Sequence, residues 1–167
     1  MNFDPFLAWV ESTALSQWVV GSPSIFAFPG ILVIHAIGMG FAVGISAAMD
    51  LRILGVAPGV PLAEMRRLLP ILWVGFWLNA VSGLLLLVGY PTKALTNPVF
   101  YLKLILIGVA MTLVVRISRS AADHSNAANE FPTHLRRLAV ISLVCWAGAI
   151  TAGRLLAYTY SRLSQTF

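Results

Sequence analysis

The sequence holds few charged residues and a single cysteine. Charged side chains make up 10% of its 167 residues, whereas about 25% is usual for soluble globular proteins. That shortage excludes an ordinary soluble domain, and a hydrophobic content of 59% with a mean hydropathy of +0.86 indicates a membrane protein. Because Cys145 has no second cysteine to pair with, an intrachain disulfide and a CxxC metal or redox motif are also excluded.

Acidic residues are scarcer still, with six of them against eleven lysines and arginines. In a soluble protein the resulting net charge of +5 would suggest nucleic acid as a partner. Here the arginines stand at the ends of apolar runs, as in membrane proteins, so we expect no nucleic-acid partner. The N-terminus lacks the basic stretch of a cleaved signal peptide and carries Asp4 and Glu11 instead, so we expect it to be retained.

Long apolar runs dominate the rest of the chain. About 20 apolar residues allow a helix to cross the hydrocarbon core of a lipid bilayer, and four runs are long enough. The prediction is an all-α polytopic membrane protein, a single domain over residues 1–167 folded as a four-transmembrane-helix bundle. The transmembrane helices are expected at 29–54, 67–89, 99–117 and 138–160. Residues 3–20 are too polar to span and suit an interfacial amphipathic helix anchored by Trp9 and Trp18.

Basic residues are distributed unevenly between the two sides of the expected membrane. One side, shared by the first and third loops, carries Arg52, Arg66, Arg67, Arg116, Arg119, Arg136 and Arg137. The other side carries only Lys93 and Arg162. By the positive-inside rule the arginine-rich loops are cytoplasmic, which predicts a multi-pass protein of the bacterial inner (cytoplasmic) membrane with both termini in the periplasm.

The first apolar run contains one histidine, His35, and an ionisable residue inside a span is a functional-site candidate. His35 shares a helical face with Gly38, Met39, Ala42, Ser46 and Met49. The nearly opposite face is a ridge of Ala36, Gly40, Gly44 and Ala48. Both faces suit contact with another helix, so we expect this helix to be central in the bundle. The run ends at Asp50 and Arg52, which we expect to form an interfacial ion pair.

Each span places one polar residue in the middle or outer half of the bundle. At 1.5 Å per residue, His35 lies roughly 25 Å from the arginines at the cytoplasmic end, Lys103 roughly 20 Å and Arg154 roughly 25 Å. Asn79 lies near mid-membrane, at roughly 18 Å. No acidic residue lies within a span at that depth, so two cations beside a histidine call for an anionic ligand.

Haem b fits this chemistry. The imidazole of His35 would ligate the iron, and Lys103 and Arg154 would pair with the propionates. The other members of the expected cofactor site are Asn79 and Tyr158 as supporting residues, with Gly38 and Gly83 as clearance for the macrocycle. The second axial ligand would be Lys103, Met39, water or nothing. A quinone or an anionic lipid headgroup would use the same cations.

Simpler interpretations of the same residues stay open. Lys103 and Arg154 would then merely extend to the membrane interface. His35 would pack inside the bundle, hydrogen-bonded to Asn79 or to a backbone carbonyl. The glycines of the first span would serve helix packing rather than a cofactor.

The first run, PGILVIHAIGMGFAVGISAAMDLRILG at residues 29–55, resembles a family of small four-helix bacterial inner-membrane proteins known mainly as domains of unknown function. The likeness lies in the histidine, the spaced glycines and the Asp-Leu-Arg ending. More distantly, a histidine on the first helix and a lysine opening a later one, in YLKLILI at 101–107, are similar to HemJ-type protoporphyrinogen oxidases and CopD-type copper-resistance proteins. In the HemJ-type family such a pair is associated with haem b and activity, which implies these roles for His35 and Lys103.

The resulting hypothesis is an inner-membrane haem b-binding protein that transfers electrons with quinone, a porphyrin or a partner subunit. One alternative is a noncatalytic accessory subunit of a larger membrane complex, in which the glycine ridge packs against the partner. Another is a small permease or copper-handling protein. The lipid bilayer is the expected environment, and a homo-oligomer or a larger complex is the assembly that the glycine ridge would serve.

Overall fold

The structure is a computed structural model that describes residues 4–56, 58–123 and 131–163. Within these ranges every regular element is a helix, and no strand occurs. The helices long and apolar enough to cross a membrane are α3 (Phe28–Ile53), α5 (Leu69–Gly89), α7 (Pro98–Asp123) and α8 (Thr133–Leu163). The predicted all-α bundle with four transmembrane helices is confirmed.

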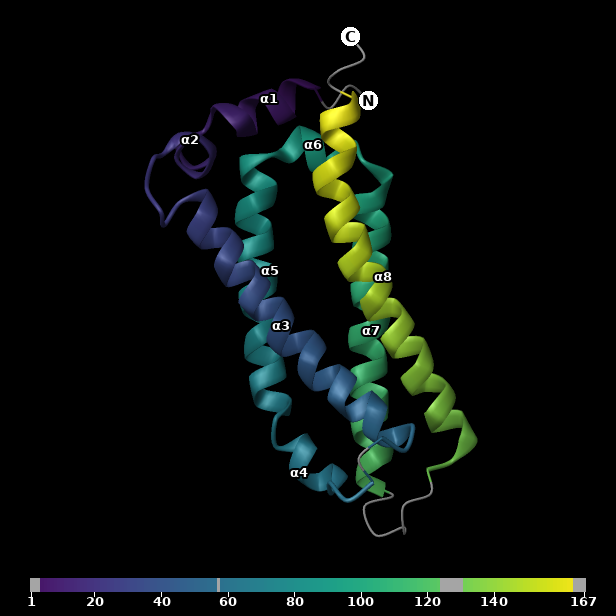
Figure 1. The fold of residues 1–167 in the computed structure, drawn as a ribbon. Helices are drawn as coiled ribbons and strands as arrows, with labels where there is room; N and C mark the ends of the chain where they lie inside the picture. The colour runs from purple at the N-terminus through teal and green to yellow at the C-terminus, as the bar shows by residue number, and fades with distance from the viewer. Residues whose placement is uncertain (1–3, 57, 124–130, 164–167) are drawn as a thin grey trace.

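Short helices lie at the two ends of the bundle. They are α1 (Asp4–Ser12), α2 (Ala14–Gly21), α4 (Leu62–Arg66) and α6 (Pro91–Leu95). Figure 1 places α1, α2 and α6 at one end together with the last turns of α8, and α4 at the opposite end, where α7 ends and α8 begins. These two ends are called the α6 end and the α4 end.

Proline and glycine set the limits of α3. Pro29 lies in its first turn, where a missing backbone N–H costs no hydrogen bond. At the other end Gly55 has a φ of +99°, and the N–H groups of Gly55 and Val56 bond to the carbonyls of Arg52 and Leu51 at 3.1 and 3.0 Å. This is a Schellman motif, which favours glycine because a Cβ would be strained at positive φ.

The N-terminal segment consists of two helices rather than the single helix expected over 3–20. The break falls at Thr13, whose Oγ1 accepts a hydrogen bond from the backbone N–H of Ser16 at 3.3 Å. A threonine oxygen in this position satisfies one of the free N–H groups at the start of a helix. Thr13 therefore starts α2 as a new helix.

Both N-terminal helices are fastened to the bundle. Val19 of α2 is fully buried, and a Cβ built on Gly89 of α5 would lie 2.9 Å from its side chain. Glu11 of α1 accepts a hydrogen bond of 2.7 Å from the hydroxyl of Thr92 in α6. The segment thus docks on α5 and α6 at one end of the molecule.

The long helices form two hairpins, α3–α5 and α7–α8. In the first hairpin the backbones touch, because a Cβ on Gly38 would lie 2.7 Å from the carbonyl oxygen of Gly75. Such an approach needs small residues on both helices. The hairpins meet mainly where α3 packs against α8, and Figure 1 shows α3 running obliquely from α5 at the α6 end toward α7 and α8 at the α4 end.

Apolar side chains join the hairpins from the middle of the bundle to the α4 end. One cluster contains Ala42, Leu72, Ala110, Met111, Val114, Cys145 and Trp146. The second, nearer α4, contains Ile53, Leu62, Leu113, Ile117, Leu135 and Ala139. In the half toward the α6 end, polar side chains such as His35 and Lys103 are partly buried instead.

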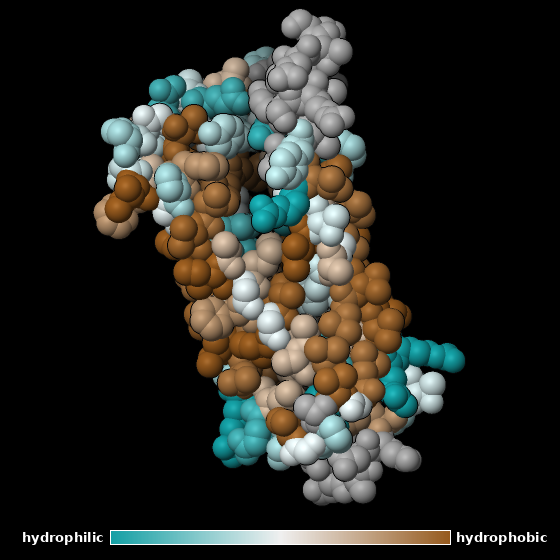
Figure 2. Space-filling view, in the orientation of Figure 1, coloured by the Kyte–Doolittle hydropathy of each residue, from teal (hydrophilic) through white to brown (hydrophobic). Residues whose placement is uncertain are grey.

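The outside of the bundle is apolar over its middle. Large hydrophobic side chains that are more than half exposed include Val74, Trp77, Leu84, Ile105 and Val144. Figure 2 shows a broad hydrophobic band on the visible face, with hydrophilic residues gathered toward the two ends. Contact with lipid explains such a surface, so the chain is a multi-pass membrane protein.

One face of α3 has no neighbour in the described chain. Gly40 and Gly44 are exposed, and a Cβ on either would meet nothing within 4 Å. The opposite face, with Gly38, Ala42 and Ser46, is buried against α5 and α8. The helix is central as expected, but only one of its two faces is covered.

Candidate functional site

A group of polar and small residues lies inside the bundle in the half toward the α6 end. His35 comes from α3, whereas Asn79, Ser82 and Gly83 come from α5. The three residues of α5 share one helical face because they stand at positions i, i+3 and i+4. Lys103 of α7 completes the group, which is called the His35 site.

The imidazole of His35 is held by α5. Its Nδ1 lies 3.1 Å from Oγ of Ser82. The Ser82 hydroxyl donates its own hydrogen to the carbonyl of Leu78 at 2.6 Å, so its oxygen accepts from the imidazole. This network assigns the hydrogen to Nδ1, which leaves Nε2 as the free nitrogen of the neutral ring.

Two further contacts fix His35 against α5. The side-chain amide of Asn79 donates to the backbone carbonyl of His35 at 2.8 Å. A Cβ on Gly83 would lie 3.1 Å from Cε1 of His35, a tighter contact than side chains usually make. The space beside Gly83 is therefore occupied by the imidazole ring, and glycine gives that ring room.

Lys103 brings a positive charge to the same region from α7. Its side chain passes α8 at Gly153, where a Cβ would lie 3.7 Å from both Cε and Nζ. Its ammonium group acts on His35 through a Coulomb interaction. Within the described chain Lys103 forms no ion pair or hydrogen bond. A partly buried ammonium group with three free hydrogens suits an anionic group that the described residues do not supply.

The remaining sequence-predicted residues lie elsewhere. Gly38 is buried at the crossing of α3 and α5, where the backbone of α5 fills the space that a macrocycle would need. Arg154 is exposed, although its neighbour Gly153 contacts Lys103. Tyr158 is 67% exposed. The residues that the structure brings together are His35, Asn79, Gly83 and Lys103.

Sequence reasoning missed Ser82 and Gly153 as members of the site. Ser82 follows Asn79 by three residues, and a hydroxyl on the same face as an interior amide is a signal that points to it. Gly153 has no local signal, because its role depends on the path of Lys103 across α8.

Asp50 and Arg52 do not form the expected ion pair. Side chains two residues apart on a helix point about 200° apart, so the prediction was geometrically wrong. Arg52 donates from Nε to the carbonyl of Val60 at 2.6 Å, and its guanidinium lies 5.5 Å from the ring centre of Phe131. Asp50 is buried against α8 instead, where the hydroxyl of Ser142 is within reach of its carboxyl group.

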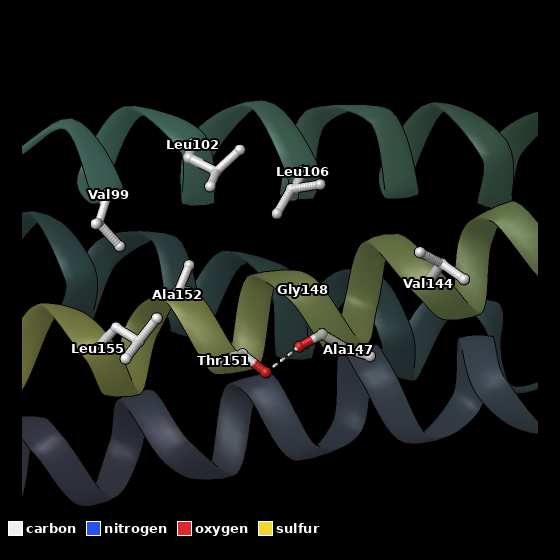
Figure 3. Close-up of a pocket in the computed structure, with 9 residues that line it drawn as sticks. All are labelled: Val99, Leu102, Leu106, Val144, Ala147, Gly148, Thr151, Ala152 and Leu155. Carbon is white, nitrogen blue, oxygen red and sulfur yellow. Dashed lines mark hydrogen bonds between the residues drawn. The ribbon is translucent and has the colours of Figure 1, made fainter.

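A separate cavity of about 500 Å³ lies along the groove between α7 and α8. Its lining consists of Val99, Leu102, Leu106, Val144, Ala147, Gly148, Thr151, Ala152 and Leu155. Figure 3 shows that the only polar side chain among them, Thr151, bonds to the carbonyl of Ala147 in its own helix, at 2.8 Å. These lining residues thus offer no free polar side chain that would orient a substrate.

The described residues contain no group of three or more His, Cys, Asp or Glu side chains that could hold a metal ion. The chain therefore does not build a metal site from such side chains in these ranges. A single imidazole with a free Nε2 does suit one axial position on a metal whose other ligands belong to a macrocycle. The donor set of the His35 site fits haem in this respect.

The fold and this site define a multi-pass helical membrane protein with a polar site where its two hairpins face each other. Comparisons with known protein families, curated proteins and solved structures find no match.

Proposed function

We propose that the chain is a haem b-binding protein of the bacterial inner membrane that transfers electrons with a quinone, a porphyrin or a partner subunit. The state of His35 carries the proposal, because Ser82 accepts the Nδ1 hydrogen and Nε2 stays free. Metal-bound histidines commonly donate their other ring hydrogen to a fixed acceptor, which sets the orientation of the ring. Haem bound at this site would supply one-electron redox chemistry.

The charge of Lys103 supports the same proposal. Haem carries two propionate carboxylates, and a hydrogen bond from an ammonium to a carboxylate is about twice as strong as a neutral one. Lys103 has no anionic partner in the described chain. Arg154 is exposed one residue beyond Gly153, which puts a second cation near the edge of the site.

The macrocycle would lie between the hairpins rather than beside Gly38. The backbone of α5 closes the space at Gly38, and the imidazole of His35 occupies the space at Gly83. The apolar clusters that join the hairpins lie nearer the α4 end. Figure 2 shows a hollow between α3 and α8 near the α6 end, where a flat apolar ring would have access.

A second protein ligand for the iron would come from Lys103 of α7 or from Met39, which follows His35 by one turn on α3. As an iron ligand Lys103 would be neutral, and as a propionate partner it would be charged, so these two roles of Lys103 exclude each other.

The arginine distribution supports an orientation for this proposal. Seven arginines stand at the ends of the long helices near α4 or in α4 and its flanking turn, namely Arg52, Arg66, Arg67, Arg116, Arg119, Arg136 and Arg137. By the positive-inside rule the α4 end is cytoplasmic and the α6 end periplasmic. The His35 site then belongs to the periplasmic half of the bundle.

Visible absorption spectra of the detergent-purified protein test the proposal. The wild type, expressed with added haem, is expected to show a Soret band and a reduced alpha band, and His35→Ala is expected to lose both. His134→Ala is the matched control, because His134 is exposed at the start of α8 and should leave the bands unchanged. A colourless wild type after haem supplementation, or bands that survive in His35→Ala, would overturn the proposal.

A second candidate function is that of an accessory subunit in a larger membrane complex. The observation that favours it is the open space beside Gly40 and Gly44 on the outer face of α3. Small residues at such positions allow another helix to approach closely. Gentle detergent extraction tests this candidate: a stoichiometric partner that is lost in Gly44→Leu supports it, and a wild type that purifies without any partner contradicts it.

A further inference from the structure

A second polar group lies between α3 and α8, nearer the α4 end than His35. Trp146 of α8 donates its Nε1 hydrogen to Oγ of Ser46 in α3 at 2.9 Å, and both side chains are buried. Asp50 follows Ser46 by one turn, and Ser142 precedes Trp146 by one turn on α8. Asp50, Ser46, Ser142 and Trp146 together are called the Asp50 cluster.

Asp50 is enclosed in this cluster. The residue is 1% exposed, and Ser142 is 0% exposed. The hydroxyl groups of Ser46 and Ser142 lie near its carboxyl group. Within the described chain, Asp50 Oδ2 and Ser142 Oγ are both buried without a hydrogen-bond partner. Native proteins leave few buried polar atoms unsatisfied, so a buried carboxyl group in this state calls for an explanation.

The charged groups on the helices around the cluster do not neutralise Asp50. Arg52 of α3 and Arg136 of α8 each donate to a backbone carbonyl, and Arg67 pairs with Glu64 at 3.0 Å. α5 has no titratable residue. The other titratable residues described on neighbouring helices near this end are Arg66, Arg116, Arg119, His134, Arg137 and Cys145. Among the described residues, none forms an ion pair with Asp50.

We propose that Asp50 is a proton-binding site, in which the carboxyl group holds a proton on Oδ2 and donates it to Oγ of Ser142. A carboxylate without a cation is costly in the interior of a membrane protein, whereas a neutral carboxylic acid with hydrogen-bond partners is tolerated. One proton removes the charge and makes Oδ2 a hydrogen-bond donor, which the oxygen of Ser142 can accept.

A proton fits the cluster better than a metal cation. Hard cations such as Ca²⁺ and Mg²⁺ take about six or more oxygen ligands. In the cluster, Oγ of Ser46 already accepts the indole hydrogen of Trp146. Asp50 Oδ2 and Ser142 Oγ are the two unpartnered oxygens that remain, which suffice for a shared hydrogen but not for a metal coordination shell.

The position of the cluster gives proton binding a structural consequence. The contact between α3 and α8 is where the two hairpins mainly meet. Loss of the proton from Asp50 would leave a negative charge in that contact, and no cation among the described residues forms an ion pair with it. Protonation of Asp50 therefore strengthens the contact between the hairpins, independently of any ligand at His35.

Infrared spectroscopy of the full-length protein in lipid vesicles tests the proposal directly. Ordinary carboxyl groups are ionised at neutral pH, so a carboxylic acid carbonyl band at that pH reports a protonated buried group. Labelling aspartate with ¹³C is expected to shift this band in the unmodified protein, which contains only three aspartates, Asp4, Asp50 and Asp123. The band is expected to vanish in Asp50→Asn, to move toward weaker hydrogen bonding in Ser142→Ala, and to persist in the control Asp4→Asn.

Two results would overturn the proposal. One is the absence of an aspartic acid band at neutral pH in the ¹³C-labelled wild type, which shows Asp50 to be ionised. The other is a carboxylate band of Asp50 that responds to sodium or calcium and not to pH, which shows a metal-cation site. Because the label works in the wild type, the test stands even if Asp50→Asn does not fold.

Discussion

Nδ1 of His35 lies 3.1 Å from Oγ of Ser82, and this contact ties the imidazole to α5 and not to α8. Helix α3, which carries His35, touches α5 through the backbone at Gly38, so the ring is held within the tightly packed first hairpin. Lys103 belongs to the second hairpin and reaches the region past Gly153. The His35 site is thus divided between the hairpins, and a ligand that bound both residues would join them.

Replacing Ser82 by alanine is expected to weaken both the fold and ligand binding. A buried donor left without its acceptor costs about 1–3 kcal/mol of unfolding free energy. If haem binds to Nε2 of His35, loss of the Ser82 hydroxyl that accepts from Nδ1 should lower the affinity for haem about 10–100-fold. Thermal unfolding and haem titration measure the two effects. Ser118→Ala is the control, since among the described residues the Ser118 hydroxyl bonds only to Val115 in its own helix. Wild-type behaviour of Ser82→Ala would contradict the assignment of the hydrogen to Nδ1.

Gly38 and Gly40 are expected to respond in opposite ways to alanine. At Gly38 the added Cβ meets the backbone of α5 at 2.7 Å, and such overpacking typically costs about 1–3 kcal/mol. At Gly40 nothing lies within 4 Å, and alanine in a helix is favoured over glycine by about 0.5–1 kcal/mol. Thermal unfolding of both variants in detergent makes the comparison. Equal stability of the two variants would show that the crossing of α3 and α5 is not as tight as described.

The transmembrane helices were predictable because run length and charge placement decide which segments cross a membrane. The interior position of His35 and Asn79 also followed from polar residues in apolar runs. What the sequence did not indicate is which residue on another helix each side chain meets. Asp50 lies near Ser142 because α3 runs obliquely toward α8, after passing close to α5 at Gly38 and Gly75. A helical wheel carries no information about such crossings.

The glycines illustrate a second limit of sequence reasoning. Spaced glycines indicate close approach, but not what approaches. Gly38 admits a helix, Gly83 admits the imidazole of His35, and Gly44 faces open space. The expectation that Gly38 clears space for a macrocycle therefore conflicts with the packing at the crossing, although its presence on the interior face was correctly inferred.

Replacing Lys103 by methionine is expected to separate ligand binding from folding. A hydrogen bond to a charged group is worth about 1.5–3 kcal/mol, so affinity for haem should fall by about ten- to a hundredfold. Without ligand, removing a partly buried unpaired charge should leave stability unchanged or raise it. Haem titration and thermal unfolding of the same preparation measure both. Lys93→Met is the control, because Lys93 lies in α6 over the ring of Tyr90. Equal losses of affinity in the two variants would rule out a specific role for Lys103.

The hydrogen bond between Trp146 and Ser46 is expected to join the two hairpins energetically. Ser46→Ala leaves the buried indole N–H without an acceptor, which costs about 1–3 kcal/mol. Once Trp146→Phe has removed that N–H, the same Ser46→Ala change should cost clearly less. A double-mutant cycle on the unfolding free energy is therefore expected to give a coupling of about 1 kcal/mol, within the range found for residues in contact. Pairing Ser46→Ala with Trp77→Phe provides the control, because Trp77 is 62% exposed on α5 and should show no coupling. A cycle that closes near zero for Ser46 and Trp146 would mean that the contact between α3 and α8 gains its stability from apolar packing alone.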